Sequence, residues 1–441
     1  MLLGFLAKDW FSPAVSPLGE FSYDLHRQLA EQWGGKERWG WSESAGWSLD
    51  RPNDEETGKN GDPAVASNEP KTDLDWLMNG TSRTTVITNP QVSPSETNGL
   101  DDVYPRWLQT DPAALQLISE RTTTGQVDPL QLCRFLLEQC LANGVILHHP
   151  ARATKLIKTN PNDPNSPTLV HLEVVETIDD KGHSESSTSS PRTDSISSSI
   201  ERSSSSGSTS ARTPSIREHS VWGDRRTRSI EISCDSLVIA AGCWTPRVYR
   251  TLFPNAKKVP KVSPLSGHSL ILKSKRWPAE IVDANAVPSS LPRVCHAVFT
   301  SDPSGFSPEM FSRVGGDIWL GGLNSSTLPL PNLASDAHGM ISRSSIRTLT
   351  DVAKKLCGDD VEVIEEALCF RPIAPTGNPI VAKVKERDLG EGPKPNGGVF
   401  LATGHGPWGI SLSLGTGRVV SEMVLGKETS VNVDGLSKWD I

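Results

Sequence analysis

The amino-acid sequence predicts an α/β fold, and three regions support this prediction. Residues 234–246 contain a continuous apolar run that ends in small residues, which is typical of a parallel-sheet strand buried on both faces. Residues 399–402 form a second short apolar run, and a glycine-rich turn and a helix from about Thr416 to Leu425 follow it. Residues 260–396 mix strand and helix patterns, which indicates a second, mixed domain.

Helices are expected where apolar residues recur at helical spacing or where a capping residue opens a segment. The first helix is expected over 17–33, and large residues at every fourth position predict one apolar face on it: Phe21, Leu25, Leu29 and Trp33. Asp128 before Pro129 predicts a capped start for a helix over 129–143. Two more helices are expected over 112–119 and 345–357.

Strands are expected where apolar and polar residues alternate. Residues 169–175 and 229–234 predict two antiparallel strands that pair as neighbours. A strand is also expected over 144–147, directly after the helix 129–143. The mixed region contributes further expected strands over 267–273, 297–300, 317–322 and 361–364.

Two polar segments, residues 50–72 and 179–229, interrupt these patterns. Their composition cannot bury enough apolar surface to offset chain entropy, so we expect disordered low-complexity inserts. The second insert is a serine-rich loop between the two paired strands. It is either a passive solvated loop or, through the basic sites 212–215 and 225–229, a contact for a kinase or a trafficking partner.

Composition and charge give no support for nucleic-acid binding, a transmembrane segment or a structural metal site. The formal net charge of −8 gives no reason to expect a nucleic-acid partner. No apolar run approaches the roughly 18 residues that a transmembrane segment needs. The seven cysteines include no Cys-x-x-Cys pair, which predicts reduced thiols in the cytoplasm and no structural metal site.

Two motifs carry a resemblance to a known family. Residues 238–246 (VIAAGCWTP) and 404–417 (GHGPWGISLSLGTG) resemble the D-amino-acid-oxidase (DAO) superfamily of FAD-dependent oxidoreductases. The resemblance implies a Rossmann-like FAD-binding domain of the glutathione-reductase type and an α+β substrate domain with a large antiparallel sheet. Residues 4–10 and 16–19 are similar to a eukaryotic branch that includes fungal oxidoreductases implicated in endosome-to-Golgi retrieval.

The resemblance also implies site residues. Cofactor contacts are expected at Gly4, Ala153, Ala240, Ala241, Gly242, Trp244, Gly404, Gly406, Trp408, Gly409 and Ile410. Arg371, within the Arg-Pro element, is expected to bind a substrate carboxylate through its guanidinium fork, with a structural ion pair as the alternative. His405 is expected to orient substrate, unless only its backbone takes part.

The family resemblance assigns the chain to two discontinuous domains. The FAD-binding domain would comprise residues 1–20, 121–178, 230–256 and 397–427, and the substrate domain would comprise residues 21–120 and 257–396. The family's opening strand, its Gly-x-Gly-x-x-Gly turn and the acidic residue that binds ribose have no counterpart near Met1. We therefore expect an N-terminally incomplete domain, through a gene-model error, a true truncation or a natural pseudoenzyme.

These observations predict an FAD-dependent oxidoreductase that oxidises the C–N bond of a small amine or amino acid. Amides around residues 406–410 are expected to stabilise negative charge on the reduced flavin, aided by the following helix dipole. The alternative is a catalytically inactive family member that acts in endosomal trafficking or as a scaffold. The expected location of the protein is the cytoplasm, with association with late endosomes. A third interpretation is a flavin-free product that does not fold stably.

Overall fold

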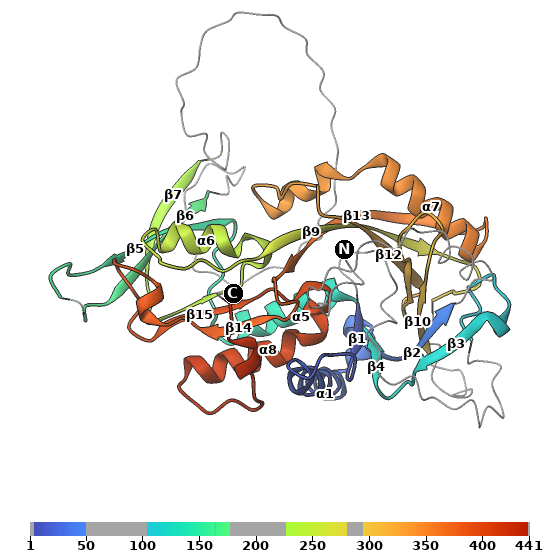
Figure 1. The fold of residues 1–441 in the computed structure, drawn as a ribbon, viewed down its shortest axis with the longest axis horizontal. Coiled ribbons are helices and arrows are strands. Elements are labelled where there is room, and N and C mark those ends of the chain that lie inside the picture. The colour runs from blue at the N-terminus through green and yellow to red at the C-terminus, as the bar shows by residue number, and fades with distance from the viewer. Residues whose placement is uncertain (1–3, 50–103, 164, 177–225, 280–293, 440–441) are drawn as a thin grey trace, which may run out of the picture.

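The structure is a computed structural model that describes residues 4–49, 104–163, 165–176, 226–279 and 294–439 (Figure 1). The two expected inserts, 50–72 and 179–229, lie outside these ranges, apart from residues 226–229, most of which belong to a strand. Within the described ranges, no helix combines the length and the apolar character that crossing a membrane requires.

A nine-stranded curled sheet forms the larger part of the fold (Figure 1). Across the sheet the strands are β1 (Phe5–Ala7), β4 (Thr124–Gln126), β2 (Ser42–Leu49), β10 (Cys295–Thr300), β11 (Glu309–Ser312), β12 (Asp317–Ser325), β9 (Ser263–Lys273) and β13 (Glu362–Ile373), with β3 (Leu115–Ser119) paired to β2. Neighbours run antiparallel, apart from β2 and β10. This sheet confirms the expected large antiparallel sheet and the four expected strands of the mixed region.

Apolar residues cover both faces of the nine-stranded sheet. Helix α7 (Arg343–Cys357) packs its apolar side against Leu270 and Leu272 of β9 on one face. The intervening Ile271 joins the cluster on the other face. There, Phe311 lies between the rings of Phe5 and Trp319, with centroid distances of 5.4 Å to each. The alternation along β9 is what a strand with two covered faces produces.

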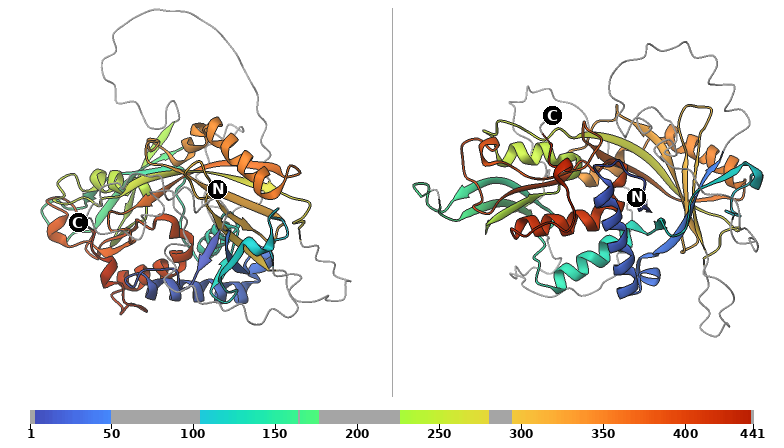
Figure 2. Two further views of the ribbon diagram at one scale, coloured as in Figure 1. Left: turned by 45° about the vertical axis from the view of Figure 1, so that its right-hand side comes forward. Right: turned by 60° about the horizontal axis from the view of Figure 1, so that its bottom comes forward.

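A three-stranded sheet lies beside the large one. Its order is β14 (Ile380–Lys383), β15 (Gly398–Thr403) and β8 (Ser236–Ile239), with β15 and β8 parallel. Helices α6 (Thr245–Leu252) and α8 (Gly409–Val424) lie on opposite sides of it (Figure 1, Figure 2). The expectation of a strand buried on both faces is wrong for β8, because Val238 is 42% exposed on a face that no described helix or strand covers.

The third sheet is an antiparallel meander of β5 (Ala151–Lys158), β6 (Thr168–Val175) and β7 (Thr227–Ser233). The register Leu169 to Ser233 confirms the predicted pairing of these two segments. The expected strand over 144–147 is wrong: Val145, Ile146 and Leu147 form no strand and are exposed. An apolar run becomes a strand only when a partner supplies hydrogen bonds, and no described strand pairs with this run.

The remaining helices are α1 (Ser16–Trp33), α2 (Gly35–Trp39) and α5 (Pro129–Ala142). The cap of α5 is confirmed, because the Asp128 carboxylate accepts the amides of Leu130 and Gln131. The helix expected over 112–119 is wrong. Only the short 3₁₀ turn Pro112–Ala114 is helical, since residues 115–119 pair with β2 as strand β3.

The apolar face predicted for α1 is not the face that the structure buries most fully. Phe21, Leu25 and Leu29 are half-buried and Trp33 is exposed. The fully covered face carries Leu18, Gly19, Ser22, Tyr23, His26 and Ala30 instead. This face lies against α8, whose backbone offers polar partners to Ser22 and His26.

Candidate functional site

A cavity of about 780 Å³ lies where β8 and β15 end and α8 begins. Its lining comes from β8 and the turn after it, from the end of β15, and from one side of α8: Val238, Ala240, Gly242, Ala402, Thr403, His405, Gly409, Ser413, Thr416, Gly417 and Val420. The carboxyl ends of parallel strands are where α/β sheets bind ligands. The sequence therefore folds its two motif segments into one site.

Hydroxyl side chains fasten these two segments to each other. Thr403 Oγ1, at the end of β15, lies 3.1 Å from the Gly242 carbonyl oxygen and donates to it. Thr245 Oγ1 donates to Thr403 Oγ1 at 3.2 Å. These bonds hold the turn after β8 against the turn after β15.

Three glycines leave the cavity wall open. A Cβ atom added at Gly242, Gly409 or Gly417 would meet no atom within 4 Å. Gly242 also has a φ of 52°, in the left-handed region that favours glycine. A flat ligand can therefore approach the backbone closely at all three positions.

The turn between β15 and α8 has a glycine spacing that sequence analysis missed. Gly404, Gly406 and Gly409 form a Gly-x-Gly-x-x-Gly pattern between a strand and a helix, the local context of a dinucleotide fingerprint. Gly404 and Gly406 have φ values of 73° and 55°. The pattern departs from a complete dinucleotide unit, because no described strand follows α8 in this sheet.

Helix α8 begins earlier than its sequence suggested. The expected start near Thr416 is wrong, and the helix runs from Gly409. The glycines at 409, 415 and 417 look like turn residues in the sequence, yet all three belong to the helix. The residues of α8 that line the cavity recur three or four positions apart. This spacing would have indicated a common face if the predicted helix had started at Gly409.

His405 lines the cavity and is held by α8. Its Nε2 atom lies 3.0 Å from Thr416 Oγ1. Burial lowers the pKa of His405 from 6.5 to about 4, so the ring is neutral at pH 7. A neutral ring can orient a ligand by hydrogen bonding without adding charge to the site.

Arg371 is a buried cation on β13. Its side chain is 8% exposed, and its Nη1 donates to Asn324 Oδ1 at 2.7 Å. A Cβ at Gly267 would lie 2.2 Å from Nη1, so this glycine makes room for the guanidinium. No carboxylate of the described residues forms an ion pair with Arg371. The next residue, Pro372, lines the cavity.

Several expected cofactor residues lie away from the cavity lining. Gly4 packs against the Val127 carbonyl, where a Cβ would lie 1.9 Å from the oxygen. Ala153 lies in β5 and packs against the apolar cluster between the third sheet, α6 and the three-stranded sheet β14–β15–β8. The Trp244 indole donates to the Pro331 carbonyl at 2.9 Å.

The other expected residues are sequence neighbours of lining residues but are not among the residues that line the cavity. Ala241 caps the 3₁₀ turn Gly242–Trp244, and Gly404 and Gly406 shape the turn before α8. Trp408 is buried and packs edge-on against Phe11, with centroids 4.9 Å apart. Ile410 offers its carbonyl to α1.

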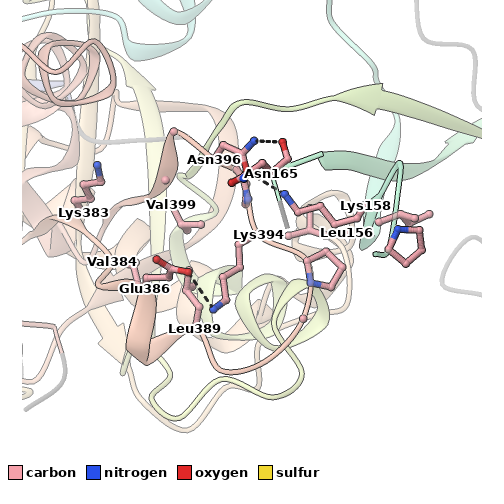
Figure 3. A pocket seen from close by; sticks show the side chains of 17 residues that line it. Leu156, Lys158, Asn165, Lys383, Val384, Glu386, Leu389, Lys394, Asn396 and Val399 are labelled. Carbon is pink, nitrogen blue, oxygen red and sulfur yellow. Dashed lines mark hydrogen bonds and ion pairs between the residues drawn. The ribbon is translucent and has the colours of Figure 1, made fainter. Parts of the chain in front are cut away.

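A larger cavity of about 890 Å³ lies elsewhere, between β5 and the loop that joins β14 to β15 (Figure 3). Two of its three lysines already have polar partners. Lys158 Nζ donates to the Ser166 carbonyl at 2.8 Å and to Asn396 Oδ1 at 2.9 Å, and Lys394 lies 3.7 Å from Glu386. None of the expected site residues lines it, so the smaller cavity is the candidate site.

Comparison with known proteins identifies the domain. The profile of the family described as "FAD dependent oxidoreductase" (DAO) matches residues 209–423. The chain is 28% identical over 201 residues to "Putative oxidoreductase C1F5.03c" of Schizosaccharomyces pombe and 24% identical over 233 residues to "Putative oxidoreductase TDA3" of Saccharomyces cerevisiae. These matches cover 45% and 51% of the chain but only 44% and 39% of the relatives.

Solved structures share the fold. Glycine oxidase from Geobacillus kaustophilus superimposes with a TM-score of 0.54 at 17% identity, over 99% of this chain and 86% of the other. Iminodiacetate oxidase from Chelativorans sp. BNC1 gives a TM-score of 0.56 at 14% identity, over 99% and 88%. With the family match and the cavity at its two motif segments, the chain therefore contains an FAD-dependent oxidoreductase domain of the DAO family.

Proposed function

We propose that this chain binds FAD at the cavity between β8, β15 and α8 and oxidises the C–N bond of a small amine or amino acid. The observation that carries the proposal is the glycine-lined cavity at the carboxyl ends of two parallel strands. The open backbone at Gly242, Gly409 and Gly417 fits a planar cofactor, because no side chain stands between it and the peptide groups.

The residues of the cavity have distinct parts in this proposal. Gly242 and Gly409 would let the cofactor lie against the backbone, and the positive end of the α8 dipole would favour its anionic portion. The neutral ring of His405, fixed by Thr416, would donate or accept a hydrogen bond without changing the charge of the site. FAD, when bound, would accept two electrons and a proton from the carbon next to the substrate nitrogen.

Arg371 supports a substrate that carries a carboxylate. A buried guanidinium with an amide oxygen as its described partner keeps donors and a full positive charge for an anion. Glycine oxidase and iminodiacetate oxidase, two of the proteins that share the fold, are named for carboxylate-bearing amines. We therefore place the substrate carboxylate at Arg371.

The proposal is tested by the visible absorbance of the purified full chain, alone and after titration with FAD. Flavin bands that bleach under anaerobic conditions with glycine, iminodiacetate, L-proline or D-amino acids would support the proposal and narrow the substrate. A chain that gains no flavin spectrum at high micromolar FAD would overturn it, and an inactive family member would then be the better interpretation.

The role of Arg371 has its own test. We expect Arg371→Met to keep the flavin spectrum and to slow bleaching by at least about 100-fold, because a lost charged hydrogen-bond pair costs about 3 kcal/mol. The matched control is Arg343→Met on α7, an arginine whose side chain is 78% exposed. Equal bleaching rates in the two variants would remove Arg371 from the substrate site.

A further inference from the structure

The buried contact between α1 and α8 includes polar groups beside the apolar side chains of Leu18 and Leu412. Ser22 and His26 are one turn apart on α1, are 0% and 1% exposed, and both form hydrogen bonds to the first turns of α8. Buried polar groups persist where they have specific partners. Here the partners are backbone groups of α8, the helix that begins at the candidate cavity.

Ser22 bridges two groups of one α8 turn. Its Oγ donates to the Ser411 carbonyl at 2.6 Å and accepts the Gly415 amide at 3.0 Å. These are the carbonyl and the amide that an uninterrupted α-helix joins directly. Gly415 makes the approach possible, because a Cβ there would lie 2.8 Å from Ser22 Cβ.

His26 holds the peptide group just before this turn. Its Nε2 lies 3.0 Å from the Ile410 carbonyl oxygen, so this nitrogen carries the proton and donates it. A peptide group is planar, so fixing the Ile410 carbonyl also fixes the Ser411 amide of the same plane. That amide belongs to the first helical turn, whose N–H groups have no acceptor within the helix.

Strand β1 fastens the same turn from another side. Ser411 Oγ donates to the Phe5 carbonyl at 3.1 Å and accepts the Ala7 amide at 3.4 Å. The first turn of α8 is therefore tied to β1 and to α1 on the side away from the cavity residues Gly409, Ser413 and Thr416.

We propose that Ser22 and His26 are positioning residues, which hold the first turn of α8 so that its amides face the cofactor in a fixed direction. The inference rests on the proposed function for the identity of the ligand. The hydrogen bonds that join Ser22 and His26 to α8, which we call the clamp, do not depend on that function. Preorganised amides stabilise developing negative charge because they need not reorient when the charge appears. Loosening the clamp therefore weakens cofactor binding without removing a group that touches the cofactor.

The test compares four variants of the full chain by hydrogen–deuterium exchange, first without FAD. In His26→Leu and Ser22→Ala we expect amides of residues 409–416 to exchange at least about tenfold faster, because the first variant loses one buried hydrogen bond and the second loses two. His26→Gln retains a donor of similar reach and should recover most of the protection. Gln28→Ala, an exposed change on the same helix, should match the wild type.

The same variants are then titrated with FAD. We expect the FAD dissociation constant to rise about tenfold in His26→Leu and Ser22→Ala, and to stay unchanged in Gln28→Ala. Unchanged exchange over residues 409–416 would overturn the inference, and so would equal acceleration in the distant helix α7, which would mean general destabilisation. A wild-type chain that binds no FAD would instead reject the proposed function, while the exchange data still decide whether the clamp exists.

Discussion

The nine-stranded sheet and the three-stranded sheet differ in how their strands are covered. In the large sheet, β9 has a strand on each side and an apolar cluster on each face. In the small sheet, β8 has one described partner and exposes Val238 beside the cavity. Burial on both faces gives stability, whereas an open edge and glycine turns leave room for a ligand. We therefore expect mutations in the first region to change stability and mutations in the second to change binding.

The largest effect is expected in the core of the large sheet. Phe311→Ala should lower the free energy of unfolding by about 3–5 kcal/mol, because a fully buried ring stacked between Phe5 and Trp319 leaves a cavity. Val238→Thr on β8 should change it by less than about 0.5 kcal/mol. Urea denaturation measures both. Similar losses in the two variants would break the comparison.

The next effect depends on pH and arises beside the small sheet. Burial lowers the pKa of both His26 and His405 from 6.5 to about 4, so the folded state binds fewer protons than the unfolded state. The contribution of the neutral rings to stability is fully present above about pH 6.5 and is lost as the pH falls toward 4. For each histidine, the free energy of unfolding should fall by about 2 kcal/mol between pH 7 and pH 5.

Urea denaturation at several pH values measures this slope. His26→Gln and His405→Gln should each flatten it, and the double variant should flatten it most. Gln28→Ala serves as the control and should retain the full slope. If the single variants keep the wild-type slope, these rings are not buried in the neutral form.

The smallest effect has opposite signs on the two sides of α8. Gly417→Ala should raise stability by about 1 kcal/mol, because alanine favours the helix and the new Cβ meets no atom within 4 Å. Gly415→Ala should lower stability by about 1–3 kcal/mol, because its Cβ would lie 2.8 Å from Ser22 Cβ and 3.0 Å from Leu18 Cδ1. Thermal unfolding distinguishes the two, and shifts of the same sign would contradict the assigned faces.

Part of the candidate site could be predicted from its residue types. The segments that contain Ala240 and Gly242, and His405 and Gly409, line one cavity as the motifs indicated. The lining from Thr403, Ser413 and Thr416 was missed, because polar residues at helical spacing carry no signal until the helix start is known. Ser22 and His26 were missed because polar residues in a helix usually face water.

The sequence by itself determined the elements whose causes are local. Asp128 before Pro129 specifies the start of α5, and alternation along 169–175 and 229–234 specifies two strands of a meander. Only the tertiary structure decided that residues 115–119 form a strand and that α1 buries Ser22 rather than Phe21. Both outcomes depend on hydrogen bonds to distant partners: Ser22 and the Ser411 carbonyl are 389 residues apart. Periodicity records where apolar side chains recur, but it does not record which backbone groups another segment will offer.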